Sequence, residues 1–189
     1  VTLPDTVDFQ SSFTTVGAND AIQYNRATGD IFIATVGRVV DEAGDTGCLN
    51  ADGSCVSRIY RLPAAADSVP RVVFACGKPQ GLCEWLRWAV NPGDNSLIVV
   101  TRESTSDEPS VTLSKVAIEN GSVLFSKQYD TTEYKDGPLT MANGGAVAYQ
   151  YIQRAETFSI RTIDMATGEV SEEIIYRANA GEENSNIRS

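Results

Sequence analysis

The chain of 189 residues contains no histidine. Histidine is the base of Ser–His–Asp and Cys–His hydrolases, a frequent zinc ligand, and the side chain whose charge changes near neutral pH. Its absence excludes those catalytic sites, histidine-bound zinc and histidine general acid–base chemistry. The sequence also lacks a Gly-rich phosphate loop, a Walker pattern and a nucleophile elbow.

Long apolar runs and clusters of basic residues are missing as well. A membrane-spanning helix needs about 20 consecutive apolar residues, whereas runs such as Leu97–Val100 have only the length of a strand. Lys and Arg total 15 against 25 Asp and Glu, which gives a net charge of −10. Because nucleic acids and anionic membranes are bound through clustered basic side chains, we expect neither nucleic-acid binding nor membrane insertion.

What the chain does contain is a strand–turn–strand pattern that recurs three times. Helical periodicity is nowhere sustained, so the pattern predicts a single all-β domain over residues 1–189. Its three units cover about 21–75, 84–127 and 138–177. The expected strands are 22–24, 31–36, 57–62 and 71–75, then 84–90, 96–101, 111–116 and 122–127, and finally 138–141, 146–152, 158–163 and 170–177.

Two internal similarities support the repeat. The turn Ala27–Asp30 has the same chemistry as Ala166–Glu169, with a Gly that is free to take positive φ. The third strands share a basic residue among apolar positions, and aligning Ile59, Leu113 and Ile160 gives intervals of 54 and 47 residues. These intervals are close to the about 40–50 residues of a four-stranded propeller blade.

The pattern resembles the bacterial-type β-propeller repeats, in which an aliphatic strand leads into an Asp-x-x-Thr-Gly turn. Ile163–Glu169 carries the best match, with the turn at Asp164–Glu169, while the first two units match more loosely. The resemblance implies about three four-stranded antiparallel blades of a β-propeller. It implies no activity, because propellers serve many functions.

Three blades are fewer than the about 4–8 of a closed propeller, and they leave apolar faces uncovered. We therefore expect the chain to be part of a larger propeller, or to complete its ring with another copy or another chain. The partly alternating segment Val7–Phe13 is a candidate additional strand. The alternative fold is a closed β-sandwich of about twelve strands, which covers its own faces.

Four cysteines form two pairs, Cys48 with Cys55 and Cys76 with Cys83, each seven residues apart. Local pairing is favoured among the three connectivities because a short loop brings its own ends within bonding range. Small disulfide-closed loops indicate an oxidising compartment, so we expect a secreted, extracellular or periplasmic protein. Free buried thiols in a cytosolic protein and a four-thiolate zinc site are the alternatives.

Aromatic residues provide the candidate ligand-binding positions. Strand alternation places Trp85 and Arg87 on one face of the expected strand 84–90, where the indole could stack on a sugar or a peptide. Tyr149 and Tyr151 share one face of a later strand in the same way. Packing between sheets is the alternative role for all of these aromatic side chains.

The acidic loop after the first two expected strands is a candidate calcium site. Calcium prefers about six to eight oxygen ligands, often from a Gly-containing loop. The loop offers Asp41, Asp45, Asn50 and Asp52, although an alignment with an EF-hand places Cys48 at the first ligand position. A solvated acidic loop is the alternative, and no other cofactor is expected.

These features predict a secreted or cell-surface binding or assembly module of β-propeller type, which associates with itself or with a protein partner. A carbohydrate-binding β-sandwich and part of a carboxylate-dependent hydrolase are the alternatives. Carboxylates such as Glu84 and Asp94 lie in no distinctive motif. We therefore assign no catalytic residue and expect no intrinsic catalysis.

Overall fold

The computed structural model describes residues 22–35, 38–40, 46–48, 56–65, 68–76, 82–104, 110–129, 134–154 and 156–177. Within them, every regular element is a strand except the short 3-10 turn η1 (Asn143–Gly145). The prediction of an all-β chain with three four-stranded antiparallel sheets is confirmed. Among the described residues no helix has the length and apolar character needed to span a membrane.

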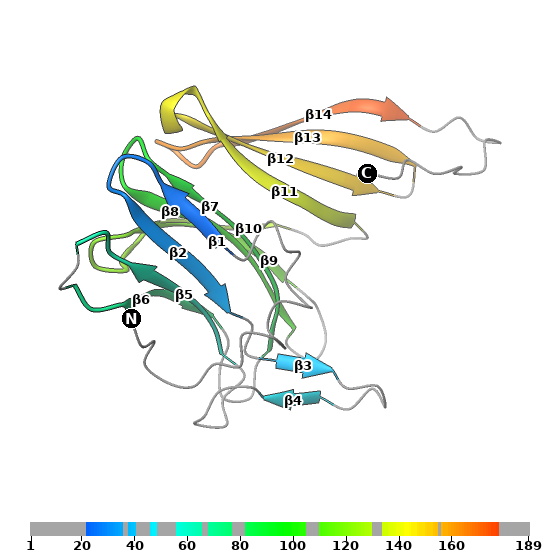
Figure 1. The fold of residues 1–189 in the computed structure, drawn as a ribbon. Coiled ribbons are helices and arrows are strands. Elements are labelled where there is room, and N and C mark those ends of the chain that lie inside the picture. The colour runs from blue at the N-terminus through cyan, green and yellow to red at the C-terminus, as the bar shows by residue number, and fades with distance from the viewer. Residues whose placement is uncertain are drawn as a thin grey trace.

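Each four-stranded sheet uses strands in their chain order, and Figure 1 shows the three sheets following one another along the chain. Sheet I contains β1 (Ile22–Asn25), β2 (Asp30–Thr35), β5 (Ser57–Leu62) and β6 (Arg71–Cys76). Sheet II contains β7 (Leu82–Asn91), β8 (Ser96–Ser104), β9 (Ser110–Ala117) and β10 (Val123–Tyr129). Sheet III contains β11 (Tyr134–Ala142), β12 (Val147–Arg154), β13 (Thr157–Asp164) and β14 (Val170–Arg177).

Two regions differ most from the sequence expectation. The segment between the second and third strands was expected to be a loop, but β3 (Arg38–Val40) and β4 (Thr46–Cys48) pair as a two-stranded ribbon. Strands of three residues are too short to give a periodic signal. β11 begins at Tyr134 instead of 138, because a bulge between Asp136 and Leu139 lets the strand continue past a proline that has no N–H.

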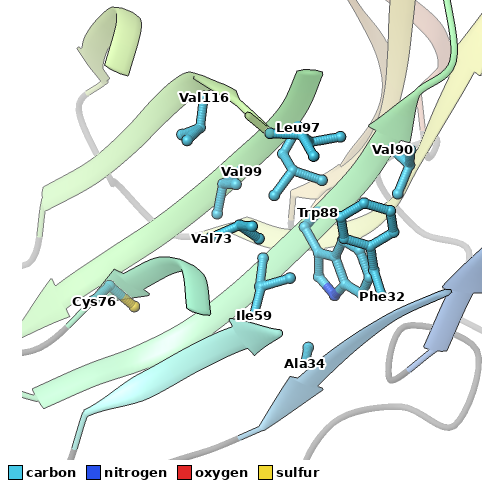
Figure 2. Close-up of a cluster of buried hydrophobic side chains, with 11 residues drawn as sticks. Phe32, Ala34, Ile59, Val73, Cys76, Trp88, Val90, Leu97, Val99 and Val116 are labelled. Carbon is cyan, nitrogen blue, oxygen red and sulfur yellow. The ribbon is translucent and has the colours of Figure 1, made fainter. Parts of the chain in front are cut away.

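A buried apolar cluster joins sheets I and II. Trp88 and Phe32 are its largest members, and in Figure 2 the side chains of both sheets point into the same space. Trp88 on β7 therefore belongs to the core. The buried members are Phe32, Ala34, Ile59, Val73 and Cys76 from sheet I, and Trp88, Val90, Leu97, Val99, Val116 and Ile118 from sheet II.

A second buried cluster joins the opposite face of sheet II to sheet III. Sheet II is therefore the middle layer, and both of its faces are covered. This explains why Leu97–Val100 is apolar without alternation, since a strand buried on both sides needs apolar residues at every position. The members are Ala89, Ile98, Val100, Val111 and Leu113 from sheet II, and Leu139, Ala148, Ile163 and Met165 from sheet III.

The first strands of neighbouring sheets lie side by side, β1 next to β7 and β7 next to β11. The side chain of Gln23 links the first pair, because its Nε2 donates to the Trp88 carbonyl at 2.7 Å and its Oε1 accepts from the Val90 N–H at 2.9 Å. Among the described residues, no other strands of different sheets run as closely together. The three sheets thus approach one another most closely along their first strands.

Candidate functional site

The three sheets align residue by residue through the hairpin that joins their first two strands. Each hairpin leaves four residues between a closing pair, so positions counted from that pair are equivalent in the three sheets. The closing pairs are Asn25 with Asp30, Asn91 with Ser96, and Ala142 with Val147.

The third strands follow the same alignment. Ile59, Leu113 and Ile160 are equivalent, because each pairs with the residue four positions after the start of its second strand. These are the same three residues that align in the sequence. The alignment therefore identifies which side chains of each sheet face the next sheet and which face the previous one.

We call the face that a sheet turns toward the next sheet its leading face. In sheet I this face presents the buried Phe32, Ala34 and Ile59 to sheet II. In sheet II the equivalent residues Ile98, Val100 and Leu113 are buried against sheet III. In sheet III the equivalents are Tyr149, Tyr151 and Ile160, of which Tyr149 is 38% and Ile160 is 37% exposed.

The opposite surface is the trailing face, which covers the previous sheet. In sheet II it presents Trp88, Val90 and Leu97 to sheet I. In sheet III it presents Leu139, Met141 and Ala148 to sheet II. In sheet I the equivalents are Ile22, Tyr24 and Ile31, which are 51%, 63% and 41% exposed.

The open part of the trailing face of sheet I lies nearest the β1–β2 hairpin. Thr35 and Tyr60, farther along the same face, are buried. The three described sheets therefore end in two faces of opposite type that carry exposed apolar residues, a trailing face on sheet I and a leading face on sheet III.

The leading face of sheet III also carries an aromatic cluster. The rings of Tyr151 and Phe158 stack with centroids 5.8 Å apart, and Phe158 lies 5.6 Å from the ring of Tyr176 at a tilted angle. Burial raises the pKa of Tyr151, so its hydroxyl stays neutral at physiological pH. The cluster thus gives this face an uncharged aromatic centre.

Basic side chains connect each internal sheet interface at equivalent carbonyl groups. Arg71 of sheet I donates from Nη2 to the Ile118 carbonyl at 3.1 Å, and Lys115 of sheet II donates from Nζ to the Met165 carbonyl at 2.6 Å. Lys115 also forms an ion pair with Asp94 at 2.6 Å, within its own sheet. A buried ammonium group with two oxygen partners holds the β9 end of sheet II against the β13–β14 turn of sheet III.

Asparagine side chains make a second type of link between neighbouring hairpins. Asn25 donates from Nδ2 to Asn95 Oδ1 at 3.2 Å, which connects sheet I to sheet II. The equivalent Asn91 donates from Nδ2 to the Gly145 carbonyl at 2.8 Å, which connects sheet II to sheet III. Sheet III has Ala142 at this position, so its own leading face lacks the corresponding amide.

Asp30, at the start of β2, takes part in a network of hydrogen bonds and one ion pair. Burial alone would raise the pKa of Asp30, but the Ala64 N–H, the Thr28 hydroxyl and the Arg61 guanidinium together hold it below its usual value. Arg61 Nη2 lies 2.7 Å from Asp30 Oδ2. The carboxylate is fully engaged in structure and is not presented to a ligand.

The Asp-x-x-Thr-Gly turn has a direct structural explanation. Asp164 Oδ1 accepts hydrogen bonds from the N–H groups of Ala166 and Thr167 and from the Thr167 hydroxyl, at 2.8 to 3.1 Å. The Thr167 bonds and then the Ala166 bond lower the pKa of Asp164. Gly168 completes the turn with φ of 69°. The motif is therefore a turn-forming device.

A carboxylate on sheet III is also used structurally. Glu172 pairs with Arg154 through two hydrogen bonds, and Arg161 Nη2 lies 3.8 Å from Glu172 Oε2. The hydrogen bond from Arg154 lowers the pKa of Glu172, and partial burial opposes it. The described charged groups with shifted pKa values thus belong to ion pairs and turns.

Of the predicted ligand-binding residues, Tyr149 and Tyr151 share one face of sheet III, whereas Arg87 lies on sheet II. Arg87 lies half-buried on the face of sheet II that packs toward sheet III, since it alternates with Ala89. Tyr149 and Tyr151 lie on the opposite, outward face of sheet III. The backbone of Trp85 pairs with Arg102 in sheet II, and its side chain lies outside the described part.

The predicted calcium ligands Asp41, Asp45, Asn50 and Asp52 lie outside the described residues. Within the described part, no three Cys, Asp or Glu side chains cluster as metal ligands would. The side chains of Cys48, Cys55 and Cys83 are also outside it, as are Val7–Phe13. Cys76 is buried and does not carry a free thiol. The predicted pairings remain predictions.

Sequence reasoning did not single out Ile22 and Ile31, which share the trailing face of sheet I with Tyr24, or Phe158 and Tyr176 on sheet III. The signal that would have found them is the repeat itself. Once the hairpins are aligned, each of the three sheet I residues falls on a position that is apolar in the other two sheets. The open faces are therefore marked by apolar residues at interface positions.

No protein-family model matches the chain. No curated protein matches it either. Among solved structures, the chain is similar to an uncharacterized protein from Listeria monocytogenes EGD-e, with a TM-score of 0.47 and 12% sequence identity. The match covers 81% of this chain and 40% of that chain, so this chain spans less than half the length of the solved structure.

Proposed function

We propose that the chain is a binding and assembly module of β-propeller type, whose two open sheet faces are its association surfaces. The observation that carries the proposal is the equivalence of positions. Tyr149, Tyr151 and Ile160 occupy leading-face positions that are buried between the other described sheets. On sheet I, Ile22, Tyr24 and Ile31 occupy trailing-face positions that are apolar and packed against the previous sheet in sheets II and III. Exposed apolar patches of this kind mark interaction sites.

Three features support a propeller arrangement over a two-layered sandwich. The strands of each sheet follow one another in chain order, as in propeller blades. Sheet II is covered on both faces, whereas a sandwich has two layers that each keep an outer face. The first strands lie side by side, as expected when sheets surround a common axis.

Charged substitutions on the two faces test the proposal. Ile160→Asp changes the leading face of sheet III, Ile22→Asp changes the trailing face of sheet I, and the exposed loop residue Val69 gives the matched control Val69→Asp. Sedimentation velocity should show weaker association for both face variants and unchanged association for the control. Equal sedimentation of all three variants and the unchanged protein would contradict the proposal.

The proposal includes an oxidising compartment, with disulfides between Cys48 and Cys55 and between Cys76 and Cys83. The absence of a free thiol at Cys76 is consistent with it. Peptide mapping by mass spectrometry without reduction should recover each pair as one linked peptide. Four alkylatable thiols in the protein purified from its native compartment would contradict this part of the proposal.

Carbohydrate binding is a second candidate, favoured by the aromatic cluster on sheet III. Exposed or half-exposed Tyr and Phe rings on one face provide stacking surfaces for sugars. A panel of soluble oligosaccharides, titrated by calorimetry against the unchanged protein and Tyr149→Ala, tests this role. Binding that is lost in Tyr149→Ala and kept in Tyr24→Ala would favour it, and no binding by the unchanged protein would reject it.

A further inference from the structure

We infer that the two open faces are covered by a second copy of this chain, joined head to tail, so that two copies close a ring of six sheets. The inference rests on the proposed function and names the partner of the same surfaces. It also sets the symmetry of the assembly, because both contacts of the ring join a leading face to a trailing face.

The two internal interfaces are the template for this contact. Each of them joins a leading face to a trailing face, with equivalent positions buried on the two sides. The open faces of one copy are one of each type. The leading face around Ile160 therefore fits the trailing face around Ile31 of a second copy in the same way that the face around Leu113 fits sheet III. Leading-to-leading packing occurs nowhere among the described sheets.

The number of sheets favours two copies. Closed propellers contain about 4–8 blades, and two copies of a three-sheet chain supply six. A head-to-tail contact forms a closed ring when its rotation completes a circle. Closure of the ring also covers two pairs of faces in one association event. The two molecules therefore lose translational and rotational entropy once, while two interfaces form.

The contact between copies should be weaker than the internal interfaces. Ala142 and Thr162 stand where Asn91 and Lys115 stand in sheet II, so sheet III lacks the amide and ammonium groups that bond the next sheet. The ring should therefore depend on protein concentration, with monomers of 20.3 kDa in exchange with dimers of twice that mass.

Complementation between two variants tests the head-to-tail arrangement. Ile31→Asp damages only the trailing face, and Ile160→Asp damages only the leading face. Each variant alone carries the damage in both contacts of a ring and should be a monomer. A mixture of the two retains one contact between two unchanged faces, so it should form dimers that contain one copy of each, as measured by native mass spectrometry with one isotopically labelled variant.

The other outcomes overturn the inference and separate it from the proposed function. If one variant stays dimeric, like faces associate, which leaves the faces as association surfaces but rejects the head-to-tail contact. If both stay dimeric, the faces are not involved and the proposed function fails too. If the unchanged protein is a monomer, a second copy is not the partner. Hydroxyl-radical labelling of Tyr24 and Tyr149 then shows whether the two faces are accessible to a different partner. Labelled rings leave the faces open to another chain, and protected rings reject the proposed function.

The substitutions must leave the fold intact for these outcomes to hold. Circular dichroism and thermal unfolding of each variant provide that check. If either Asp variant unfolds, Tyr24→Ala and Tyr149→Ala replace it, because truncation of an exposed ring removes apolar area without adding a charge. The same complementation is then expected with smaller shifts in the dimer fraction, and no difference from the unchanged protein would overturn the inference.

Discussion

Asn91 donates its side-chain amide to the carbonyl of Gly145 at 2.8 Å, and so joins the β7–β8 hairpin of sheet II to η1 of sheet III. The Asn91 Oδ1 accepts the Gly93 N–H at 2.9 Å, which fixes the amide in its orientation. Asn91 is 1% exposed. This buried amide therefore joins sheets II and III in addition to the apolar layer and the Lys115 hydrogen bond to the Met165 carbonyl.

Gly145→Ala should destabilise the protein strongly, whereas Gly144→Ala should not. A Cβ at Gly145 would overlap the Asn91 side chain, and its φ of 98° strains any other residue. We expect a loss of at least about 1–3 kcal/mol in the free energy of unfolding. Gly144 also has positive φ but faces open space, so its cost should stay near about 1 kcal/mol. Urea unfolding of both variants measures the difference, and equal losses would contradict the role of Asn91.

Asp30→Asn should remove a pH-dependent part of the stability. The folded-state pKa of Asp30 is lowered, so its contribution is present above the usual aspartate pKa of about 3.9 and is lost as the pH falls through the folded value. We expect the variant to be less stable by about 1.5–3 kcal/mol at pH 7. The gap should close as the pH falls below the usual aspartate pKa of about 3.9 and through the lowered folded value. Chemical unfolding at several pH values checks this, and a gap that widens on acidification would contradict it.

Salt should strengthen the association between copies. Each chain carries a net charge of −10, so two copies repel each other while their contact is apolar. Raising the ionic strength from about 0.01 M to about 0.1 M shortens the Debye length from about 30 Å to about 10 Å and screens this repulsion. Sedimentation equilibrium should show a larger dimer fraction at the higher salt. A smaller fraction would indicate a contact held by ion pairs.

Ala142→Asn should tighten the contact between copies. It restores on sheet III the amide that Asn91 provides on sheet II, and places it toward the β1–β2 hairpin of the second copy. One added hydrogen bond of about 1 kcal/mol corresponds to a dimer that is about fivefold tighter per contact. Dilution series by sedimentation measure this, with Ala146→Asn, an exposed position of the same turn, as the control. Equal effects of both variants would contradict the alignment of the faces.

The sheets were predictable from the sequence because their strands alternate or are continuously apolar and are separated by Gly and Asn turns. The equivalence of Ile59, Leu113 and Ile160 could also be inferred from the sequence, because the third strands share a basic residue among apolar positions. The sequence did not show that Ile160 stays exposed, because burial depends on which sheet comes next. The sequence also did not show that Arg87 and Tyr149 lie on the faces of different sheets. The strands β3 and β4 could not be predicted, because three residues are too few to show an alternating pattern.

Concentration-dependent labelling of Tyr24 and Tyr149 tests the central claim most directly, because these rings lie on the two open faces. Hydroxyl-radical labelling of both should fall together as the protein concentration rises, while labelling of the exposed Leu124 on β10 stays constant. That result would show that association covers one leading and one trailing face. Labelling of both tyrosines that does not change while dimers form would contradict the account.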